Sequence, residues 1–491
     1  MGGRLGAAAW CFRPSGPDRL RRSAPPLPSG RLVPRPLPVR ASASFRSAWP
    51  RPNRSGGSPA DPIGVYDPLS ALRGFSRPVY VVGAGQFVNL FGSGLVYPFA
   101  TVHFHLSVGI ALSLVGIGLL ANNLGTAAGT TLGGYAADRY GRKPVMVTSM
   151  ALSSVTLAAY AGVEPLAAAT PLSPAISFVA VAAAAGITLG LYAPAAQAMI
   201  ADLTDGETRD RGYALLKVGN NAGFGLGFVV GGILYEFAEL AVFLGNGLTS
   251  GVVAVVLFAL VPRVHAATRD VALRDSVGDW GRAVADRRIL ALAGLNVGFA
   301  VMYAQMQATV PVVAIETLGL SSGQLGTLYT LNPLVIVVLQ LPIVAAVTDW
   351  RRTRGLVVSA GLWGVSMLAV WAVAGVPARV GVGLVGAFLV LRTLGEILHA
   401  PLVTSLASDL GEASERGSQL SLLEVAKRLG FGVGSAVGGA FFDYGLEWLL
   451  WPALAVVCGL LAVGLLRFER SISPVENGRS APSRSETATD P

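Results

Sequence analysis

Residues 133 to 144 read G-G-Y-A-A-D-R-Y-G-R-K-P and lie between two long apolar segments, 107–132 and 145–163. Glycines and charged residues crowd this short stretch, whereas its flanks are of membrane-spanning length. Basic residues that follow an apolar segment directly are typical of a helix that leaves the bilayer. The stretch therefore predicts two membrane-spanning helices that are joined by a tight, basic turn.

The composition of the whole chain agrees with a membrane protein. Hydrophobic residues make up 52% of the 491 residues and charged residues only 13%, against roughly a quarter charged in soluble domains. Uncharged segments recur, most of them near or above the roughly 20 residues that cross a bilayer core. Backbone polar groups in lipid must be paired within the segment, so the segments are predicted to be helices. The predicted fold class is an all-α integral membrane protein.

Twelve apolar segments follow Pro78, and the longest interruption between them, 263–288, separates two sets of six. The prediction is a six-helix bundle over 78–262, a cytoplasmic linker with an amphipathic helix over 263–288, and a second bundle over 289–466. A disordered cytoplasmic tail is expected over 467–491. The predicted spans are 79–101, 107–132, 145–163, 174–201, 213–235, 241–262, 289–313, 323–348, 355–375, 380–407, 418–441 and 447–466.

The first 77 residues differ from the rest. They contain 13 Arg, no Lys, 3 Asp and 13 of the chain's 30 prolines, and such a segment buries too little apolar surface to fold. We predict a disordered basic tail, with a targeting peptide and a spurious upstream translation as open alternatives. The net charge of +9 resides in this tail, so binding to nucleic acid is not expected.

Basic residues in the turns predict the orientation of the helices. Arginine and lysine follow the second, fourth, sixth, eighth and tenth spans, whereas the opposite turns contain only Arg379. The positive-inside rule therefore places both termini in the cytoplasm. The expected location is the plasma membrane, with an organelle envelope membrane as the alternative.

The two sets of six spans repeat each other. A shift of 207 residues superposes G-F-G-L-G-F-V-V-G-G, residues 223–232, on G-F-G-V-G-S-A-V-G-G, residues 430–439. The same shift superposes Asp202 on Asp409 and Glu236 on Asp443. Two parallel six-helix halves with a binding site between them are an architecture of secondary transporters.

The stretch 133–144 resembles the signature of the major facilitator superfamily, G-x-x-x-D-R-x-G-R-[RK], which lies between the second and third helices of those transporters. The resemblance implies a twelve-helix transporter that works by alternating access. It also implies that these residues form a latch between the halves on the cytoplasmic side in the outward-open state. The matching residues are Gly134, Asp138, Arg139, Gly141, Arg142 and Lys143.

Glycines recur every fourth residue in three spans, as at Gly223, Gly227 and Gly231. This spacing permits close helix contact in lipid, and packing is the preferred interpretation. The fifth span also resembles the family's antiporter signature G-x-x-x-G-P-x-x-G-G, with Phe228 in place of the proline. The first-span N-L-F-G-S-G-L-V-Y-P and the G-E of the tenth span, Gly395 and Glu396, most resemble multidrug-efflux proton antiporters.

The tenth span carries the strongest chemical signal. Arg392, Glu396 and His399 share one helical face near the middle of the span, where charge is costly and usually functional. Arg392 favours the ionised carboxylate and burial favours the neutral one, so Glu396 is the candidate proton carrier. A structural Arg392–Glu396 pair is the alternative.

Polar residues of other spans are candidates for a substrate cavity, although hydrogen bonding between helices is an alternative role for each. They are Gln86, Asn89, Tyr192, Gln197, Asn296, Tyr303 and Gln307.

The predicted function is secondary active transport of a small solute, as proton-coupled efflux. A proton-coupled uptake symporter and a non-transporting sensor of the same fold are the alternatives. An enzyme is not expected, because the chain shows no nucleophile–base set, metal-ligand spacing or phosphate-binding loop. The expected partners are a small-molecule substrate, protons and the lipid bilayer, with no cofactor and no metal, and the chain is expected to act as a monomer.

Overall fold

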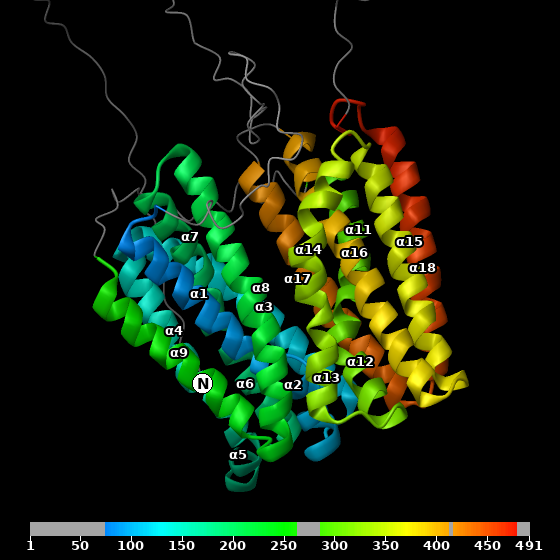
Figure 1. The fold of residues 1–491 in the computed structure, drawn as a ribbon, viewed down its shortest axis with the longest axis horizontal. Coiled ribbons are helices and arrows are strands. Elements are labelled where there is room, and N and C mark those ends of the chain that lie inside the picture. The colour runs from blue at the N-terminus through cyan, green and yellow to red at the C-terminus, as the bar shows by residue number, and fades with distance from the viewer. Residues whose placement is uncertain (1–73, 263–284, 412–415, 479–491) are drawn as a thin grey trace, which may run out of the picture. The chain divides into compact units, whose positions relative to one another are not determined.

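The computed structural model describes residues 74–262, 285–411 and 416–478, which all belong to one compact unit, Asp67–Pro491. Within these residues the chain is helical and has no β-strand (Figure 1). The predicted tail up to residue 73, most of the predicted linker helix and the end of the C-terminal tail lie outside the described residues. The all-α fold class predicted from the sequence is confirmed.

The first half of the chain forms six long helical segments, several of them divided by a short break. Their elements are α1 Arg77–Val96, α2 Phe99–Val102 and η2 His103–Ser107; α3 Leu112–Tyr140; α4 Arg142–Ala158, η3 Ala159–Gly162 and α5 Val163–Ala169; α6 Pro174–Gly190 and α7 Tyr192–Leu203; α8 Gly206–Phe237; and α9 Ala241–Leu260.

The second half repeats this arrangement. Its elements are α11 Arg287–Ala308, α12 Val310–Val312 and η4 Val313–Thr317; α13 Ser322–Tyr329 and α14 Leu331–Ala346; α15 Arg352–Trp371 and η5 Ala372–Gly375; α16 Ala378–Leu410; α17 Arg416–Asp443; and α18 Glu447–Phe468 with η6 Glu469–Ser471.

Ten helical segments in the described residues are long and apolar enough to cross a membrane. The two other predicted spans correspond to α8 and α17, which are 32 and 28 residues long. Glycine, polar and charged residues lower the mean hydropathy of these two helices. They are the same two helices that carry the repeated glycine sequence, so close packing rather than hydropathy dominates their composition.

The repeat that the sequence predicts is present in local backbone geometry. The first helical segment of each half ends in one turn of π-helix, His103–Ser107 and Val313–Thr317. Each π-turn is followed by a glycine with positive φ, Gly109 at 78° and Gly319 at 65°, a conformation that glycine adopts without a steric penalty.

The glycine series pack helices within each half. A Cβ atom on Gly231 of α8 would lie 2.6 Å from the carbonyl oxygen of Leu95 in α1. Gly133 of α3 approaches the carbonyl of Leu191 at the same 2.6 Å, and Gly438 of α17 approaches the Gln305 side chain of α11. The packing interpretation of these series therefore agrees with the structure.

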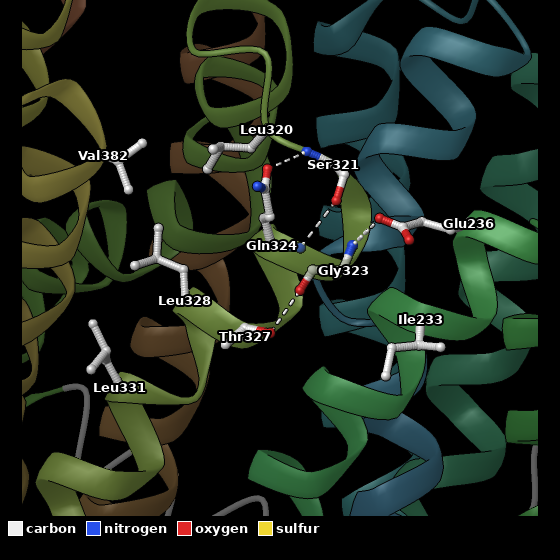
Figure 2. Close-up of a pocket in the computed structure, with 10 residues that line it drawn as sticks. All are labelled: Ile233, Glu236, Leu320, Ser321, Gly323, Gln324, Thr327, Leu328, Leu331 and Val382. Carbon is white, nitrogen blue, oxygen red and sulfur yellow. Dashed lines mark hydrogen bonds between the residues drawn. The ribbon is translucent and has the colours of Figure 1, made fainter. Parts of the chain in front are cut away.

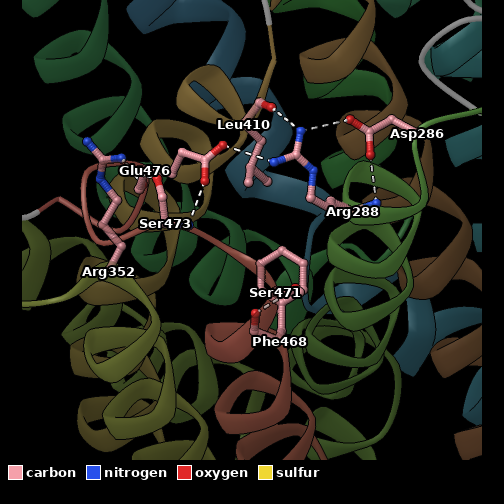
Figure 3. Close-up of polar contacts among 8 residues, drawn as sticks. All are labelled: Asp286, Arg288, Arg352, Leu410, Phe468, Ser471, Ser473 and Glu476. Carbon is pink, nitrogen blue, oxygen red and sulfur yellow. Dashed lines mark hydrogen bonds and ion pairs between the residues drawn. The ribbon is translucent and has the colours of Figure 1, made fainter.

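Residues 472–478 fold back onto the second half (Figure 3). The Arg288 guanidinium donates to Glu476 Oε1 at 3.0 Å, Arg352 donates to the Glu476 carbonyl at 2.7 Å, and Asn477 Oδ1 accepts from the Thr353 backbone at 3.0 Å. Burial raises the pKa of Glu476, but hydrogen bonds from Ser473 and the Arg288 charge outweigh it and leave this pKa lowered.

This segment corrects one boundary of the sequence prediction. Disorder was expected from residue 467, but α18 continues to Phe468 and Asn477 is buried. The apolar pattern ends near residue 466, whereas the order beyond it rests on polar contacts with distant parts of the chain. Such contacts leave no periodic signal in the sequence.

Candidate functional site

Arg392 and Glu396 form an ion pair on α16, with 2.8 Å between Arg392 Nη1 and Glu396 Oε2. Asn332 of α14 donates to the same oxygen at 3.3 Å and to Thr393 Oγ1 at 2.8 Å. The Arg392 side chain is 4% exposed and that of Glu396 26%. Both described hydrogen bonds of the Glu396 carboxylate end on Oε2, and none is described for Oε1.

Helix α15 holds this part of α16 in place. The Trp363 indole donates to the Arg392 carbonyl at 2.7 Å, and Ser359 Oγ donates to the Gly395 carbonyl at 2.8 Å. The indole of Trp363 also occupies the space that a Cβ on Gly395 would need. Gly395 thus permits the close approach that fixes the backbone on either side of Arg392 and Glu396.

Tyr303 of α11 lies between two cations. The Arg392 guanidinium carbon is 4.8 Å from the ring centroid and Lys427 Nζ of α17 is 5.7 Å from it. Cations within about 6 Å of an aromatic face are stabilised by the ring. Tyr303 therefore joins α11, α16 and α17 in one polar cluster.

The first half contributes Lys217 of α8 and Tyr97, the residue after α1. Glu396 lies within electrostatic range of both, and Tyr97 also of Arg392. The Tyr97 ring packs edge-on against Phe224 with 5.2 Å between centroids. We call Tyr97, Lys217, Tyr303, Asn332, Arg392, Glu396 and Lys427 the interior cluster, and its members come from both halves of the chain.

His399 lies on the same face of α16 but is not bonded to Glu396. Its ring packs among Phe299, Trp363 and Tyr303, with centroids 4.4, 5.6 and 6.0 Å away. The ring is buried and Nε2 has no described hydrogen-bond partner. The structure thus brings together Arg392 and Glu396, and it places His399 in an aromatic environment beside them.

Of the other predicted cavity residues, Tyr303 belongs to the interior cluster. Asn296 donates to the Leu423 carbonyl at 3.0 Å and connects α11 with α17. Tyr192 and Asn89 are buried within the first half, and the Tyr192 hydroxyl has no described partner.

The other three predicted cavity residues, like Asn296, Tyr192 and Asn89, are not members of the interior cluster. Gln197 is exposed and Gln86 half-buried, with no side-chain hydrogen bond described for either. The half-buried Gln307 accepts Thr101 Oγ1 at 2.8 Å through its backbone carbonyl. This hydrogen bond between Thr101 and Gln307 joins the two halves.

The signature residues are arranged within the first half. Helix α3 continues to Tyr140, so Gly134, Asp138 and Arg139 are helical and only Gly141, at φ 95°, forms the turn. The predicted turn is therefore shorter than the quoted stretch. We call this end of the helices the signature end.

Arg142 organises the contacts around the signature turn. It donates to Asp138 Oδ1 at 2.6 Å and lies 3.4 Å from Asp202 Oδ2 of α7. Arg352 pairs likewise with Asp409, the repeat partner of Asp202, at 2.7 Å. Lys143 Nζ lies 5.6 Å from the Phe258 ring of α9.

Close contacts between the halves are found at the opposite end of the helices, here called the far end. Asp443 at the end of α17 accepts hydrogen bonds from the backbone of Leu112 and Ser113 at 2.8 and 2.9 Å. Glu236 at the end of α8 accepts from Gly323 at 2.8 Å. These repeat-related carboxylates satisfy free N–H groups at the starts of α3 and α13.

Glycine pairs make the far-end approach possible. Gly231 and Gly438 face their own halves, whereas the next residues, Gly232 and Gly439, face the other half. A Cβ on Gly439 would lie 2.5 Å from Ser113 N, and one on Gly232 would lie 2.5 Å from the Ser322 carbonyl. Helices α3 and α17 run side by side in Figure 1. We call Gly232, Glu236, Gly439 and Asp443 the far-end clamp.

A pocket of 690 Å³ lies beside this clamp (Figure 2). Its wall is formed by residues of α8, α13, α14 and α16 and the turn before α13, and Glu236 points from it toward Gly323. No residue of the interior cluster lines it. The pocket thus belongs to the contact between the halves rather than to the ion pair.

Sequence reasoning missed Lys217 and Lys427, although both lie inside predicted spans. The signal was available, because lysine occurs only three times among 37 basic residues. Asn332, Thr393 and Tyr97 carried no comparable signal, since short polar residues and tyrosines are common in membrane helices.

Two pseudo-symmetric helical halves with a polar cluster between them define a membrane transporter. The model of the Major Facilitator Superfamily matches residues 82–321 and 295–489. The chain belongs to the major facilitator superfamily, as the signature predicted. It is a multi-span secondary transporter whose fold implies a small-molecule substrate and a lipid bilayer.

Relatives and solved structures agree with this assignment. The chain is 24% identical to the MFS-type transporter YttB of Bacillus subtilis, covering 82% of this chain and 98% of YttB. It is 25% identical to the multidrug resistance protein MdtH of Proteus mirabilis, covering 77% and 92%. It is also 25% identical to a Na(+), Li(+), K(+)/H(+) antiporter of Planococcus maritimus, covering 79% and 96%.

Two crystal structures illustrate the likeness of fold. The nucleoside transporter NupG has a TM-score of 0.67 at 12% identity, covering 80% of this chain and all of NupG. A D-xylose–proton symporter has a TM-score of 0.63 at 16% identity, covering 82% and 99%.

Proposed function

We propose that this protein exports a small solute in exchange for protons, by alternating access, as a monomer in the plasma membrane. Glu396 carries the proton, and Arg392 responds to its charge. The observation that carries the proposal is the ion pair itself: a partly exposed carboxylate beside a buried guanidinium. Charged groups inside membrane proteins are costly and mark coupling pathways.

The contacts between the halves support an inward-open state. If the basic turns are cytoplasmic, the signature end faces the cytoplasm and both termini lie there. The far-end clamp then closes the outside. The interior cluster is reached from the cytoplasm, where an exporter collects its substrate. The relatives named multidrug resistance protein and antiporter support export and proton exchange.

Flux in proteoliposomes tests this function. Vesicles that contain the full chain receive an imposed pH gradient, and the uptake of two dyes, rhodamine 123 and carboxyfluorescein, is recorded together with proton movement. Exchange predicts dye accumulation only when the lumen is acidic, and its loss with a protonophore. Accumulation only with an acidic exterior would instead indicate symport, and uptake that ignores both gradients would exclude proton coupling.

Asp138→Ala is expected to lower transport strongly with near-normal expression. Among the residues that the structure describes, the contact of the Asp138 carboxylate is with Arg142 in its own half, so folding is not expected to depend on it for a contact between the halves. The carboxylate is proposed to hold the halves together at the signature end in the outward-open state. A cysteine introduced at the signature end should then react faster with a thiol reagent. Unchanged flux would mean that the stretch serves only as a basic turn.

A further inference from the structure

Lys217 and Lys427 lie at nearby positions in the two halves, because the 207-residue shift places Lys217 on Glu424, three residues before Lys427. Lys217 lies eleven residues beyond the first residue of α8, which is about 16 Å along the axis. Both are exposed, although both lie within segments of membrane-spanning length. Exposed lysines at this depth need water or a counter-ion between the halves.

The surrounding carboxylates do not neutralise these two ammonium groups. Glu396 is held by Arg392 at 2.8 Å, and Glu424, one turn before Lys427, is held by Arg428 at 2.8 Å. Among the described residues, neither lysine forms an ion pair with a carboxylate. The interior cluster therefore carries two uncompensated positive charges, one from each half.

The choice of lysine is also informative. The chain uses 34 arginines and three lysines, yet both of these positions hold lysine. An ammonium group on a flexible stem is a compact charge that follows a moving ligand, whereas a guanidinium prefers a fixed planar partner. Lys427 Nζ already lies 5.7 Å from the Tyr303 ring, so its charge is directed toward the interior cluster.

Tyr303 lies beside Lys427, and a second group of aromatic rings in the first half includes Tyr97, a member of the interior cluster. Tyr97 is half-buried, with Phe224 and Phe228 at centroid distances of 5.2 and 6.0 Å. These rings come from the first half, whereas Tyr303 comes from the second. Rings beside positive charges suit a ligand that combines an aromatic body with a negative group.

We propose that Lys217 and Lys427 bind the negative group of an aromatic organic anion, a carboxylate or sulfonate, so that the carried solute is an anion rather than a cation. This inference rests on the proposed transport function. With one lysine on each half, the bound anion bridges the halves and favours their approach at the signature end. The Arg392–Glu396 pair stays available for the proton.

Lysine modification tests the binding site without any transport assay. The full chain in liposomes is treated with a small amine-reactive ester, and modification is measured by mass spectrometry. Carboxyfluorescein should protect Lys217 and Lys427 and leave Lys143 reactive, and rhodamine 123, which shares the xanthene ring but is cationic, should protect neither. Equal modification with and without carboxyfluorescein would overturn the proposal.

Flux measurements provide the second test. Lys217→Gln and Lys427→Gln should each weaken carboxyfluorescein transport about tenfold, the loss expected for one charge-assisted contact. Arg467→Gln removes an exposed cation of α18 and should have no effect. Rhodamine 123 transport that survives both lysine changes would overturn the anion inference and leave proton-coupled export intact. Lysine protection without flux of either dye would retain the anion site and overturn the transport proposal.

Discussion

Replacing Glu396 with glutamine is expected to abolish pH-gradient-driven transport while leaving the protein folded and able to exchange solute. The amide keeps the shape of the side chain, and its oxygen still accepts from Arg392 and Asn332, which now share Oε2 at 2.8 and 3.3 Å. It cannot bind or release a proton. The measurement compares dye accumulation under a pH gradient with exchange of labelled dye at equal pH.

The alternative, in which the pair only braces α16, predicts a different result. Glu396→Ala would then leave the guanidinium of Arg392 buried without a counter-charge, at a cost on the order of 3–5 kcal/mol. The double change Arg392→Leu, Glu396→Leu would restore much of the lost thermal stability. A stable Glu396→Gln protein with normal gradient-driven accumulation would contradict the proton role, and a Glu396→Ala protein of unchanged thermal stability would contradict the brace.

The sequence predicted the helical architecture well because each membrane-spanning helix leaves a local signal in the sequence. Apolar segments and basic turns reflect the bilayer directly, and the signature stretch located the junction of the second and third helices. The prediction failed at the turn itself. Helix α3 continues two turns beyond its apolar segment to Tyr140, since a helix needs no lipid to satisfy its own backbone.

The interior cluster was only partly predictable. Arg392 and Glu396 are four residues apart on one helix, so the sequence alone brings them together. Lys217 and Tyr97 lie within electrostatic range of Glu396 from the other half, through packing that no local pattern records. Asn296 was a predicted cavity residue, but its amide donates a hydrogen bond to the Leu423 carbonyl and so connects α11 with α17.

The far-end clamp is a repeated feature whose role only the structure reveals. The 207-residue shift pairs Glu236 with Asp443, but the shift does not indicate what either carboxylate binds. In the structure both bind backbone N–H groups at a helix start in the opposite half. In the glycine pair that precedes each carboxylate, the first glycine packs against its own half and the second packs against the other half.

Gly439→Val is therefore expected to abolish transport by opening the far end, while the neighbouring change Gly438→Val should lower thermal stability without opening the far end. The valine at 439 meets Ser113 and Leu112 of α3, in the other half. Overpacking of this kind costs about 1–3 kcal/mol, and about 1.4 kcal/mol already shifts a two-state equilibrium tenfold. The valine at 438 meets the side chains of Gln305 in α11 and of Thr309, the residue after α11. Both lie inside its own half, so this valine does not oppose the approach of the two halves.

The measurement uses a cysteine introduced at Ser113 and an impermeant thiol reagent on the far side. Labelling should rise about tenfold in the Gly439→Val protein, as that population shift requires, with a normal elution profile in detergent. Gly459→Val on α18 is the matched control, because a Cβ there meets no atom within 4 Å, and it should change neither labelling nor flux. Normal flux and unchanged labelling in Gly439→Val would show that α3 and α17 do not separate at this point. A Gly438→Val protein with the same rise in labelling as Gly439→Val would show that the two glycines do not divide their contacts between the halves.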